Sequence, residues 1–309
     1  MRVLVTGGAG FIGSHVVEAY IAAGHDIIIV DDLSSGKREN LHPQARFVHA
    51  DIQDPAVRQL IVREQVEVVN HQAAQMDVRR SVADPLFDAR VNLLGMLNVL
   101  EGAREAGVKK VIFASSGGAV YGEQDVFPAN EEHPTRPISP YGVSKRSGEH
   151  YLYYYSAVYG IPYVALRYAN VYGPRQDPHG EAGVVAIFTL RLLSGQQPVI
   201  NGDGKQTRDY VFVKDVARAN LAALPVAYTG PINIGTSIET DVNQLFGHLR
   251  SLTNSPLPEM HGPAKLGEQL RSVIAWTRAA EVLGWRPQVS LEEGLRQTVE
   301  YFHTRHNGH

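Results

Sequence analysis

The chain has 309 residues, of which 44% are hydrophobic and 20% are charged. This composition is typical of a globular protein with a sizeable core, and the length allows two domains or one domain with a smaller lobe. The formal net charge of −3 provides no overall field that would attract nucleic acid or an acidic membrane surface, so neither partner is expected. The absence of cysteine excludes disulfides, thiolate chemistry and cysteine-ligated metals.

The first residues, MRVLVTGG, form a short apolar run that ends at a glycine turn, so we expect no signal peptide. No apolar stretch approaches the ~18 residues that a membrane helix needs. We therefore expect a soluble, cytoplasmic protein. The spaced histidines His303, His306 and His309 are expected to form a solvated tail, and no metal site is predicted.

The first half of the chain alternates between strand and helix patterns. Residues 3–5 and 26–30 are apolar runs typical of buried strands, and residues 11–23 between them have the apolar spacing of a helix. Further strands are predicted at residues 47–48, 66–70, 111–114 and 162–167, and helices at residues 57–64, 85–106 and 140–159. Strands without alternation, separated by helices, favour a parallel sheet that is covered on both faces. We predict an α/β fold with a doubly wound Rossmann sheet.

The pattern changes after about Asn170, where proline and glycine become denser and short strands and helices mix without strict alternation. We predict a Rossmann domain over residues 1–170, to which later segments of the chain return. Residues 171–309 are expected to form a smaller mixed lobe that binds the substrate.

A glycine-rich turn follows the first predicted strand. The sequence GGAGFIG at residues 7–13 contains G-x-G-x-x-G, in which glycine allows the backbone to approach a pyrophosphate closely. The helix that follows offers free N–H groups to the phosphates. Asp31 lies 18 residues after Gly13, where a carboxylate accepts hydrogen bonds from ribose hydroxyls and repels a 2′-phosphate. The pattern predicts dinucleotide binding, with NAD favoured over NADP; a purely structural turn is the alternative.

Tyr141 and Lys145 form a Y-x-x-x-K pattern at the start of a predicted helix, with Ser139 as its N-cap and Pro140 as its first residue. Side chains four residues apart lie on one face of a helix. An ammonium group beside a phenol favours the phenolate, which is a suitable base or acid near neutral pH. We predict that this pair is catalytic.

These motifs, together with SSGGAVYG at residues 115–122, resemble those of the extended short-chain dehydrogenase/reductase family. Within it, the chain is most similar to nucleotide-sugar epimerases of the UDP-glucose 4-epimerase type. The segments LRYANVYGP at residues 166–174 and GDGKQTRDY at residues 202–210 extend the resemblance over nearly the whole chain. The resemblance also implies a homodimer, in which the helix that carries Tyr151 and residues 153–155 often meets its twin.

The motifs and the resemblance together imply a set of cofactor-binding residues and a set of substrate-binding residues. The cofactor, NAD, would be bound by Gly7, Gly10, Phe11, Ile12, Gly13, Asp31, Asp32, Ser34, Ser35, Gly36, Asp51, Ile52, Gln72, Ala73, Ala74, Asn92, Tyr141, Lys145 and Tyr168. The nucleotide diphosphate of the sugar would be held by Asn170, Arg208, Lys265 and Arg271. For Arg208, a surface ion pair with Asp203 or Asp209 is the alternative.

The chain departs from the family pattern at Gly117, where the family carries a catalytic serine or threonine four residues before Tyr121. Ser116, Ser115 or a bound water could supply the missing hydroxyl. We assign Ser116 as the third catalytic residue, and we place Ser115 and Gly117 among the residues that contact the substrate.

Gly118 and Ala119 stand where related 4,6-dehydratases carry an Asp-Glu pair, which favours epimerisation over dehydration. We predict NAD-dependent 4-epimerisation of UDP-glucose and UDP-galactose by transient oxidation at C4. Tyr141 would be the base and acid, and bound NAD would be the hydride carrier. The alternatives are an epimerase of UDP-GlcNAc, for which Ser272 would leave room, or of UDP-glucuronate. A net-redox keto-sugar reductase and a non-catalytic NAD-binding protein remain further alternatives.

Overall fold

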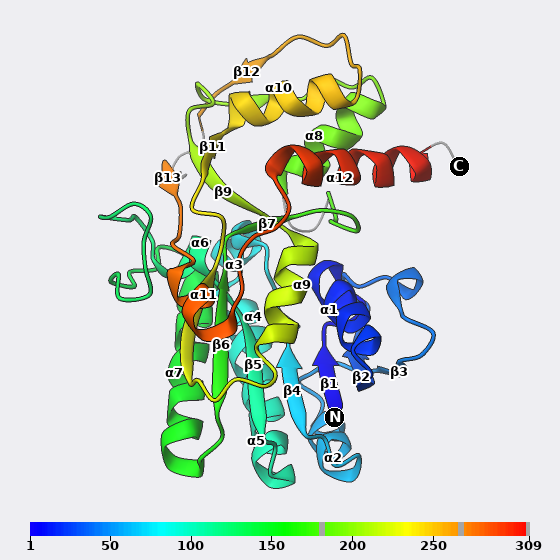
Figure 1. Cartoon of the computed structure of the whole chain (residues 1–309), viewed down its shortest axis with the longest axis vertical. Helices are drawn as coiled ribbons and strands as arrows, with labels where there is room; N and C mark the ends of the chain where they lie inside the picture. Colours follow the sequence, from blue (N-terminus) through cyan, green and yellow to red (C-terminus); the bar gives the residue numbers. More distant parts are fainter. Residues whose placement is uncertain (179–182, 265–268, 307–309) are drawn as a thin grey trace.

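The computed structural model describes residues 1–178, 183–264 and 269–306 (Figure 1). A parallel sheet of seven strands forms its centre, in the order β10-β6-β5-β4-β1-β2-β3. The strands are β1 Arg2–Thr6, β2 Asp26–Asp31, β3 Arg46–His49, β4 Val68–His71, β5 Lys110–Ser116, β6 Tyr163–Tyr168 and β10 Gly230–Ile234. The strand order reverses between β1 and β4, which is the doubly wound arrangement. The predicted α/β Rossmann fold is therefore confirmed.

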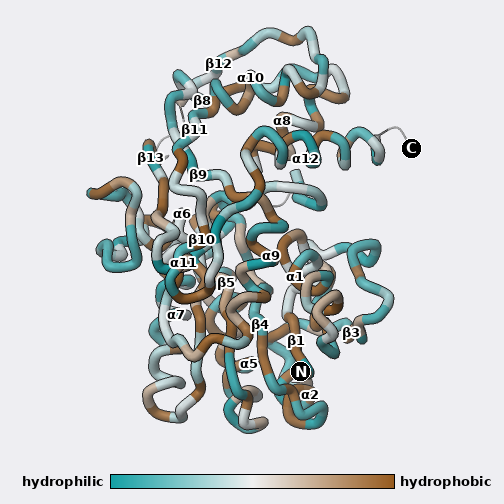
Figure 2. The backbone as a smooth tube through the Cα atoms, viewed as in Figure 1, coloured by the Kyte–Doolittle hydropathy of each residue, from teal (hydrophilic) through white to brown (hydrophobic). Residues whose placement is uncertain are grey.

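Helices cover both faces of this sheet, and each face has its own core. One face carries α1 Phe11–Ala22, α9 Val213–Ala222 and α11 Thr277–Leu283, and the other carries α2 Pro55–Arg63, α5 Met96–Ala106 and α7 Pro140–Tyr159. Successive side chains of β1 illustrate the division, since Val3 and Val5 enter the first core and Leu4 enters the second. Figure 2 shows hydrophobic residues along the central strands, as expected for a sheet buried on both faces.

The single helix predicted for residues 85–106 is instead three consecutive segments. They are α4 Pro85–Ala89, a π-helical stretch Arg90–Gly95 and α5, and an unpredicted short helix, α3 Val78–Ala83, precedes them. The apolar spacing predicts one regular helix, because a change from α- to π-type hydrogen bonding leaves that spacing almost unaltered. π-helical turns of this kind are frequent at functional sites.

A second lobe lies above the carboxyl ends of the parallel strands (Figure 1). Its sheet consists of β7 Asn170–Tyr172, β9 Thr207–Phe212, β11 Glu239–Asp241 and β13 Arg271–Ser272, and a separate pair joins β8 Ile200–Asn201 to β12 His261–Gly262. Its helices are α8 Val184–Leu193, α10 Val242–Leu252 and α12 Leu291–His306, packed around a third core. Two short helices complete the described chain, namely α6 Gly117–Val120 and a 3₁₀ turn Arg38–Asn40.

Three segments beyond residue 170 belong to the Rossmann part of the molecule, namely α9, β10 and α11. Strand β9 runs directly into α9, which packs against α1, and β10 pairs with β6 at the edge of the large sheet. The chain thus passes between the two parts more than once. Within the described ranges, no helix is both long and apolar enough to cross a membrane.

Candidate active site

The carboxyl ends of the parallel strands meet at a cavity of about 670 Å³. Most of the residues that the sequence predicts for the cofactor line this one cavity. They are Gly7, Gly10, Phe11, Ile12, Gly13, Asp31, Asp32, Ser34, Ser35, Asp51, Ile52, Gln72, Ala73, Ala74, Tyr141, Lys145 and Tyr168. Such a crevice, at the point where the strand order reverses, is the usual ligand site of an open α/β sheet.

The glycine turn between β1 and α1 forms one wall of the cavity. Gly7 has φ of +69°, and a Cβ there would stand 2.7 Å from the backbone nitrogen of Ala73. A Cβ on Gly13 would stand 2.1 Å from the carbonyl oxygen of Gly7, so both positions require glycine. No side chain caps the first turn of α1, and Phe11 and Ile12 of that turn line the cavity. The turn fits a pyrophosphate, since an uncapped helix N-terminus offers its N–H groups to an anion.

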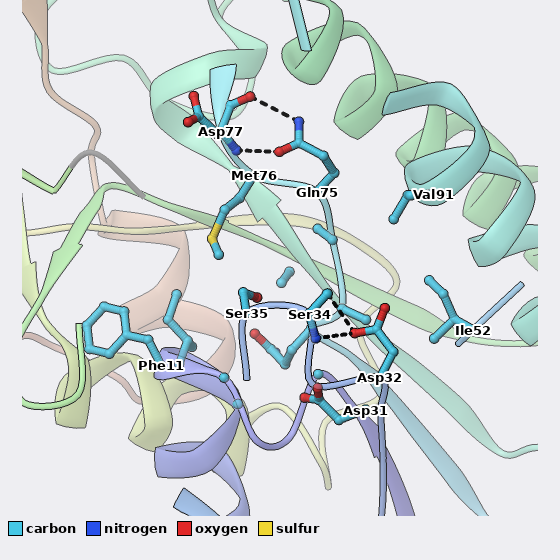
Figure 3. Close-up of a pocket in the computed structure, with 18 of the residues that line it drawn as sticks. Phe11, Asp31, Asp32, Ser34, Ser35, Ile52, Gln75, Met76, Asp77 and Val91 are labelled. Carbon is cyan, nitrogen blue, oxygen red and sulfur yellow. Dashed lines mark hydrogen bonds between the residues drawn. The ribbon is translucent and has the colours of Figure 1, made fainter. Parts of the chain in front are cut away.

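Asp31 lies at the end of β2, at the opposite end of the cavity from Gln75 (Figure 3). Its carboxylate accepts hydrogen bonds from the backbone N–H groups of Ala9, at 2.9 Å, and Leu33, at 2.8 Å. Burial raises the pKa of Asp31, and these two hydrogen bonds oppose the rise. Gly36 does not line the cavity but packs behind this carboxylate, where a Cβ would stand 2.6 Å from Oδ1. The position of Asp31 fits a ribose diol.

The loop after β4 forms the other end of the cavity. Figure 3 shows Gln75 hydrogen-bonded to the backbone of Asp77, with the side chain of Met76 directed into the cavity. Asn92 does not line the cavity; it accepts from the backbone N–H of Gln75 at 2.9 Å and donates to the Gln75 carbonyl at 2.8 Å. Asn92 therefore holds the cavity wall from behind.

The helix that carries the Tyr141 and Lys145 pair begins as the sequence predicts, with the Ser139 hydroxyl accepting from the N–H of Gly142. Lys145 is 3% exposed, and its Nζ donates to the carbonyl of Ala114 at 2.8 Å. The same Nζ lies 4.9 Å from the ring centroid of Phe113 and 5.8 Å from that of Tyr141. Burial lowers the pKa of Lys145 to about 8, and the charge of Asp88 acts in the opposite direction.

The two serines that could replace the missing hydroxyl at Gly117 have different surroundings. Ser115 is buried, and its hydroxyl donates to Glu149 Oε1 at 2.7 Å. Because a hydroxyl has a single hydrogen, this bond occupies the only proton that Ser115 can donate. Ser116 Oγ lies 4.0 Å from the point where a Cβ on Gly118 would stand, and Asn170 Oδ1 lies 3.8 Å from the same point. Ser116 and Asn170 therefore lie within contact distance of the same point beside Gly118, whereas Ser115 lines the cavity with its one proton already donated to Glu149.

A side chain from the second lobe fills the space beside the Cα atom of Gly117. A Cβ at this position would stand 2.8 Å from Cδ1 of Ile274 and 3.3 Å from the carbonyl oxygen of Tyr168. Ile274 is buried with Val120 and Tyr121, so its side chain fills the space that a serine side chain would take. The space that a serine side chain at residue 117 would need is thus filled by Ile274, which lies 157 residues later in the chain.

The residues predicted to hold the diphosphate do not line the cavity within the described ranges. Arg208 donates to the carbonyl of Thr207 at 2.8 Å. Arg271 pairs with Glu239 at 2.9 Å, and its guanidinium lies 3.7 Å from the ring centroid of Phe127. Lys265 lies outside the described residues.

The sequence does not predict several of the residues that line the cavity, among them Gln75, Met76, Asp77, Arg80, Phe87 and Val91. The first three follow β4 directly after the predicted residues 72–74, so extending the loop by three residues would have found them. The Arg80 guanidinium lies 4.0 Å from the ring centroid of Phe87, and Val91 belongs to the π-helical stretch. Nothing in the sequence distinguishes these last side chains from ordinary helix surface or core.

Residues 3–235 match the NAD dependent epimerase/dehydratase family. The chain belongs to this family. Its members include a UDP-glucose 4-epimerase of Mycolicibacterium smegmatis, which is 49% identical over 312 residues covering 99% of each chain. The match confirms the family and the NAD dependence expected from the sequence motifs.

Solved structures of the family are similar to this chain over nearly its whole length. The UDP-glucose 4-epimerase of Thermotoga maritima, solved with UDP-glucose, has a TM-score of 0.97 and 51% identity, with 99% of each chain covered. The UDP-glucose 4-epimerase of Thermus thermophilus, solved with NAD, has a TM-score of 0.92 and 45% identity, covering 98% of this chain and 99% of the other. Both lobes are therefore shared with these proteins.

The contact of Gly117 with Ile274 predicts that restoring the family serine will destabilise this protein. Gly117→Ser should lower the free energy of unfolding by about 1–3 kcal/mol, the usual cost of overpacking, measured by denaturant unfolding. Gly118→Ser is the matched control, because a Cβ there would make only ordinary contacts, the nearest at 3.8 Å, and should cost little. In an Ile274→Ala background the cost of Gly117→Ser should disappear. Equal stability of the two serine variants would show that Ile274 does not occupy this space.

Proposed function

We propose that the chain interconverts UDP-glucose and UDP-galactose by NAD-dependent 4-epimerisation. The observation that carries the proposal is the position of Tyr141 and Lys145 at a cavity whose other walls fit a dinucleotide. The relatives described above, at 45–51% identity, support the choice of reaction and of nucleotide sugar. The residues at 118 and 119 carry no carboxylate, which supports epimerisation rather than dehydration.

NAD would lie along the cavity with its pyrophosphate at the N-terminus of α1 and its adenosine ribose at Asp31. Asp31 would accept hydrogen bonds from both ribose hydroxyls, and its negative charge would disfavour a 2′-phosphate. Tyr141, Lys145 and Tyr168 would then flank the nicotinamide end. When bound, NAD supplies the hydride acceptor at C4 of the sugar and returns the hydride to the other face.

Tyr141 performs the proton transfer in this scheme. Its phenolate takes the proton from the C4 hydroxyl as the C4 carbon is oxidised, which gives a 4-keto sugar. After the keto sugar has turned over in the pocket, Tyr141 returns the same proton to the C4 oxygen. Lys145 keeps a positive charge beside Tyr141 and favours the phenolate. Ser116 and Asn170 would contact the sugar, and Arg208 would pair with the diphosphate.

The first experiment is incubation of the purified protein with UDP-galactose and NAD, with UDP-glucose followed by NMR. Conversion that proceeds without net consumption of NAD supports an epimerase. Net formation of NADH in proportion to product would instead indicate a dehydrogenase, and no conversion would refute the choice of substrate.

Tyr141→Phe tests the role of the phenol, because it removes the hydroxyl and keeps the ring. We expect kcat to fall roughly a hundredfold or more, since general acid–base catalysis contributes about that much. NAD affinity, measured by isothermal titration calorimetry, should change little. A variant with turnover near that of the unmodified protein would remove Tyr141 from the mechanism.

Ser116→Ala and Ser115→Ala form a matched pair that tests which hydroxyl contacts the sugar. Ser116→Ala should lower kcat by about tenfold or more and leave the melting temperature unchanged, because it removes a hydrogen bond to the reacting oxygen. Ser115→Ala should mainly lower stability, by about 1–3 kcal/mol, because it removes a buried donor to Glu149. The reverse assignment of the two effects would favour Ser115.

We also propose that the protein is a homodimer through the face formed by α4, the π-helical stretch and α7. Large apolar side chains are exposed on these neighbouring helices, including Leu86, Leu94, Tyr153 and Val158. Apolar groups gathered in this way usually mark an interface.

Sedimentation equilibrium tests the dimer. It should give twice the chain mass of 33.9 kDa, and Leu86→Glu combined with Tyr153→Glu should give the monomer. Ile238→Glu is the control, because Ile238 is similarly exposed but lies between β10 and β11, outside these helices. A monomeric unmodified protein, or a dimer that tolerates both glutamates, would contradict the proposed face.

A further inference from the structure

Asp88 is a carboxylate with no solvent exposure, and none of the motifs includes it. It lies on α4, and its oxygens accept three hydrogen bonds. Oδ2 accepts from the hydroxyl of Ser144 at 2.6 Å, and Oδ1 accepts from Asn92 Nδ2 at 2.9 Å and from Gln75 Nε2 at 3.1 Å. All three partners are donors, as an ionised carboxylate requires.

The three partners of Asp88 come from three different parts of the candidate active site. Ser144 immediately precedes Lys145 on α7, the helix that also carries Tyr141. Gln75 lines the cavity, and Asn92 supports the backbone of Gln75 from the π-helical stretch. One carboxylate therefore joins the helix with the Tyr–Lys pair to the loop that forms the end of the cavity (Figure 3 shows Gln75 in that loop).

Lys145 needs a nearby negative charge, because a buried ammonium is otherwise driven to its neutral form. The other groups packed around it supply no negative charge. The Ala114 carbonyl and the Phe113 ring are neutral. His71, on β4, is also neutral near pH 7, because burial lowers its pKa to about 3.

We propose that Asp88 is a positioning residue for the epimerase reaction, whose buried charge holds Lys145 in its ammonium form and whose hydrogen bonds fix α7 against the loop after β4. Asp88 contacts neither substrate nor cofactor in this scheme and acts through Lys145 and Gln75. The proposal rests on the role assigned to Lys145 under the proposed function.

The charge of Asp88 determines the direction of the pH effect. Burial lowers the pKa of Lys145 to about 8, and Asp88 opposes that shift. Without Asp88 the pKa of Lys145 falls further, so the ammonium is lost at a lower pH as the pH rises. Besides Asp88 and the neutral His71, Tyr141 faces Lys145 from the same face of α7. The alkaline limb of epimerase activity should therefore move to lower pH in a variant that lacks this carboxylate.

The test is a direct titration of Lys145 by NMR in protein labelled with ¹³C at the lysine ε-carbons, in the absence of substrate and cofactor. The chain has only seven lysines, so a Lys145→Met sample assigns the signal. Asp88→Asn keeps the shape and removes the charge. Its Oδ1 can still accept from Asn92 and Gln75, and its Nδ2 can donate to the Ser144 hydroxyl in place of the bond that Asp88 accepts. We expect the Lys145 midpoint to fall by roughly one pH unit in Asp88→Asn.

Ser144→Ala is the matched control, because it removes one hydrogen bond of Asp88 and keeps the charge; its Lys145 midpoint should stay within the error of the unmodified value. If Asp88 had only a structural role, the Lys145 midpoint would shift equally in both variants or in neither. Either result overturns the proposal. The titration needs no turnover, so its result stands even if the protein does not epimerise UDP-galactose. Failure of the Asp88 proposal can therefore be distinguished from failure of the proposed function.

A second measurement covers the case in which Asp88→Asn does not fold. Lys145→Met leaves the carboxylate without its cation, and the double variant Asp88→Asn, Lys145→Met removes both charges. The double variant should have a higher melting temperature than Lys145→Met alone. An equal or lower melting temperature would overturn the proposal.

Discussion

The buried ammonium of Lys145 is the constraint on which the arrangement of this site depends. A cation that is 3% exposed is stable only if the surrounding groups replace its lost hydration. The Ala114 carbonyl, the Phe113 ring and the charge of Asp88 do so from β5 and α4. These groups meet only because parallel strands end at one edge of the sheet and because helices cover the adjoining face. The same packing brings Tyr141, one turn earlier, to the cavity.

A buried ion pair between Arg167 and Glu149 fixes the next turn of α7. Arg167 donates to both oxygens of Glu149, at 2.8 and 2.7 Å, and also to the hydroxyl of Tyr121 at 2.9 Å. Glu149 is one turn beyond Lys145 and accepts the hydroxyl of Ser115. The end of β5, where the serines lie, is thus held against α7 and β6. Removal of one partner of such a pair is costly, because it leaves the other charge buried and alone.

The second lobe completes the site rather than simply covering it. Ile274 enters from the second lobe and takes the space beside Gly117, while Asn170 stands at the start of β7, opposite Ser116. The returns of α9 and β10 to the Rossmann sheet tie the two parts together. Ile274 thus closes the space beside Gly117, where the sequence motifs lead one to expect a serine, and Ser116 is the hydroxyl that we propose in its place.

Local patterns in the sequence carried most of the fold and the core of the site. The glycine turn, Asp31 and the Tyr141–Lys145 spacing each depend on residues close together in the chain, so their geometry follows from strand and helix periodicity. Long-range packing could not be predicted in this way. No local sequence pattern predicts that Ile274 packs against Gly117. None predicts the π-helical stretch that places Asn92 behind Gln75. Arg271, expected at a phosphate, instead pairs with Glu239 and stacks on Phe127.

The most direct test of the central claim is the fate of the hydrogen on C4 of the sugar. UDP-galactose that carries deuterium at C4 is incubated with the purified protein in ordinary water, and the product is analysed by NMR. Hydride transfer to bound NAD and back predicts UDP-glucose that keeps its deuterium at C4, with no loss of label to water. Replacement of that deuterium by solvent hydrogen would contradict a mechanism in which C4 is oxidised and reduced by one bound cofactor.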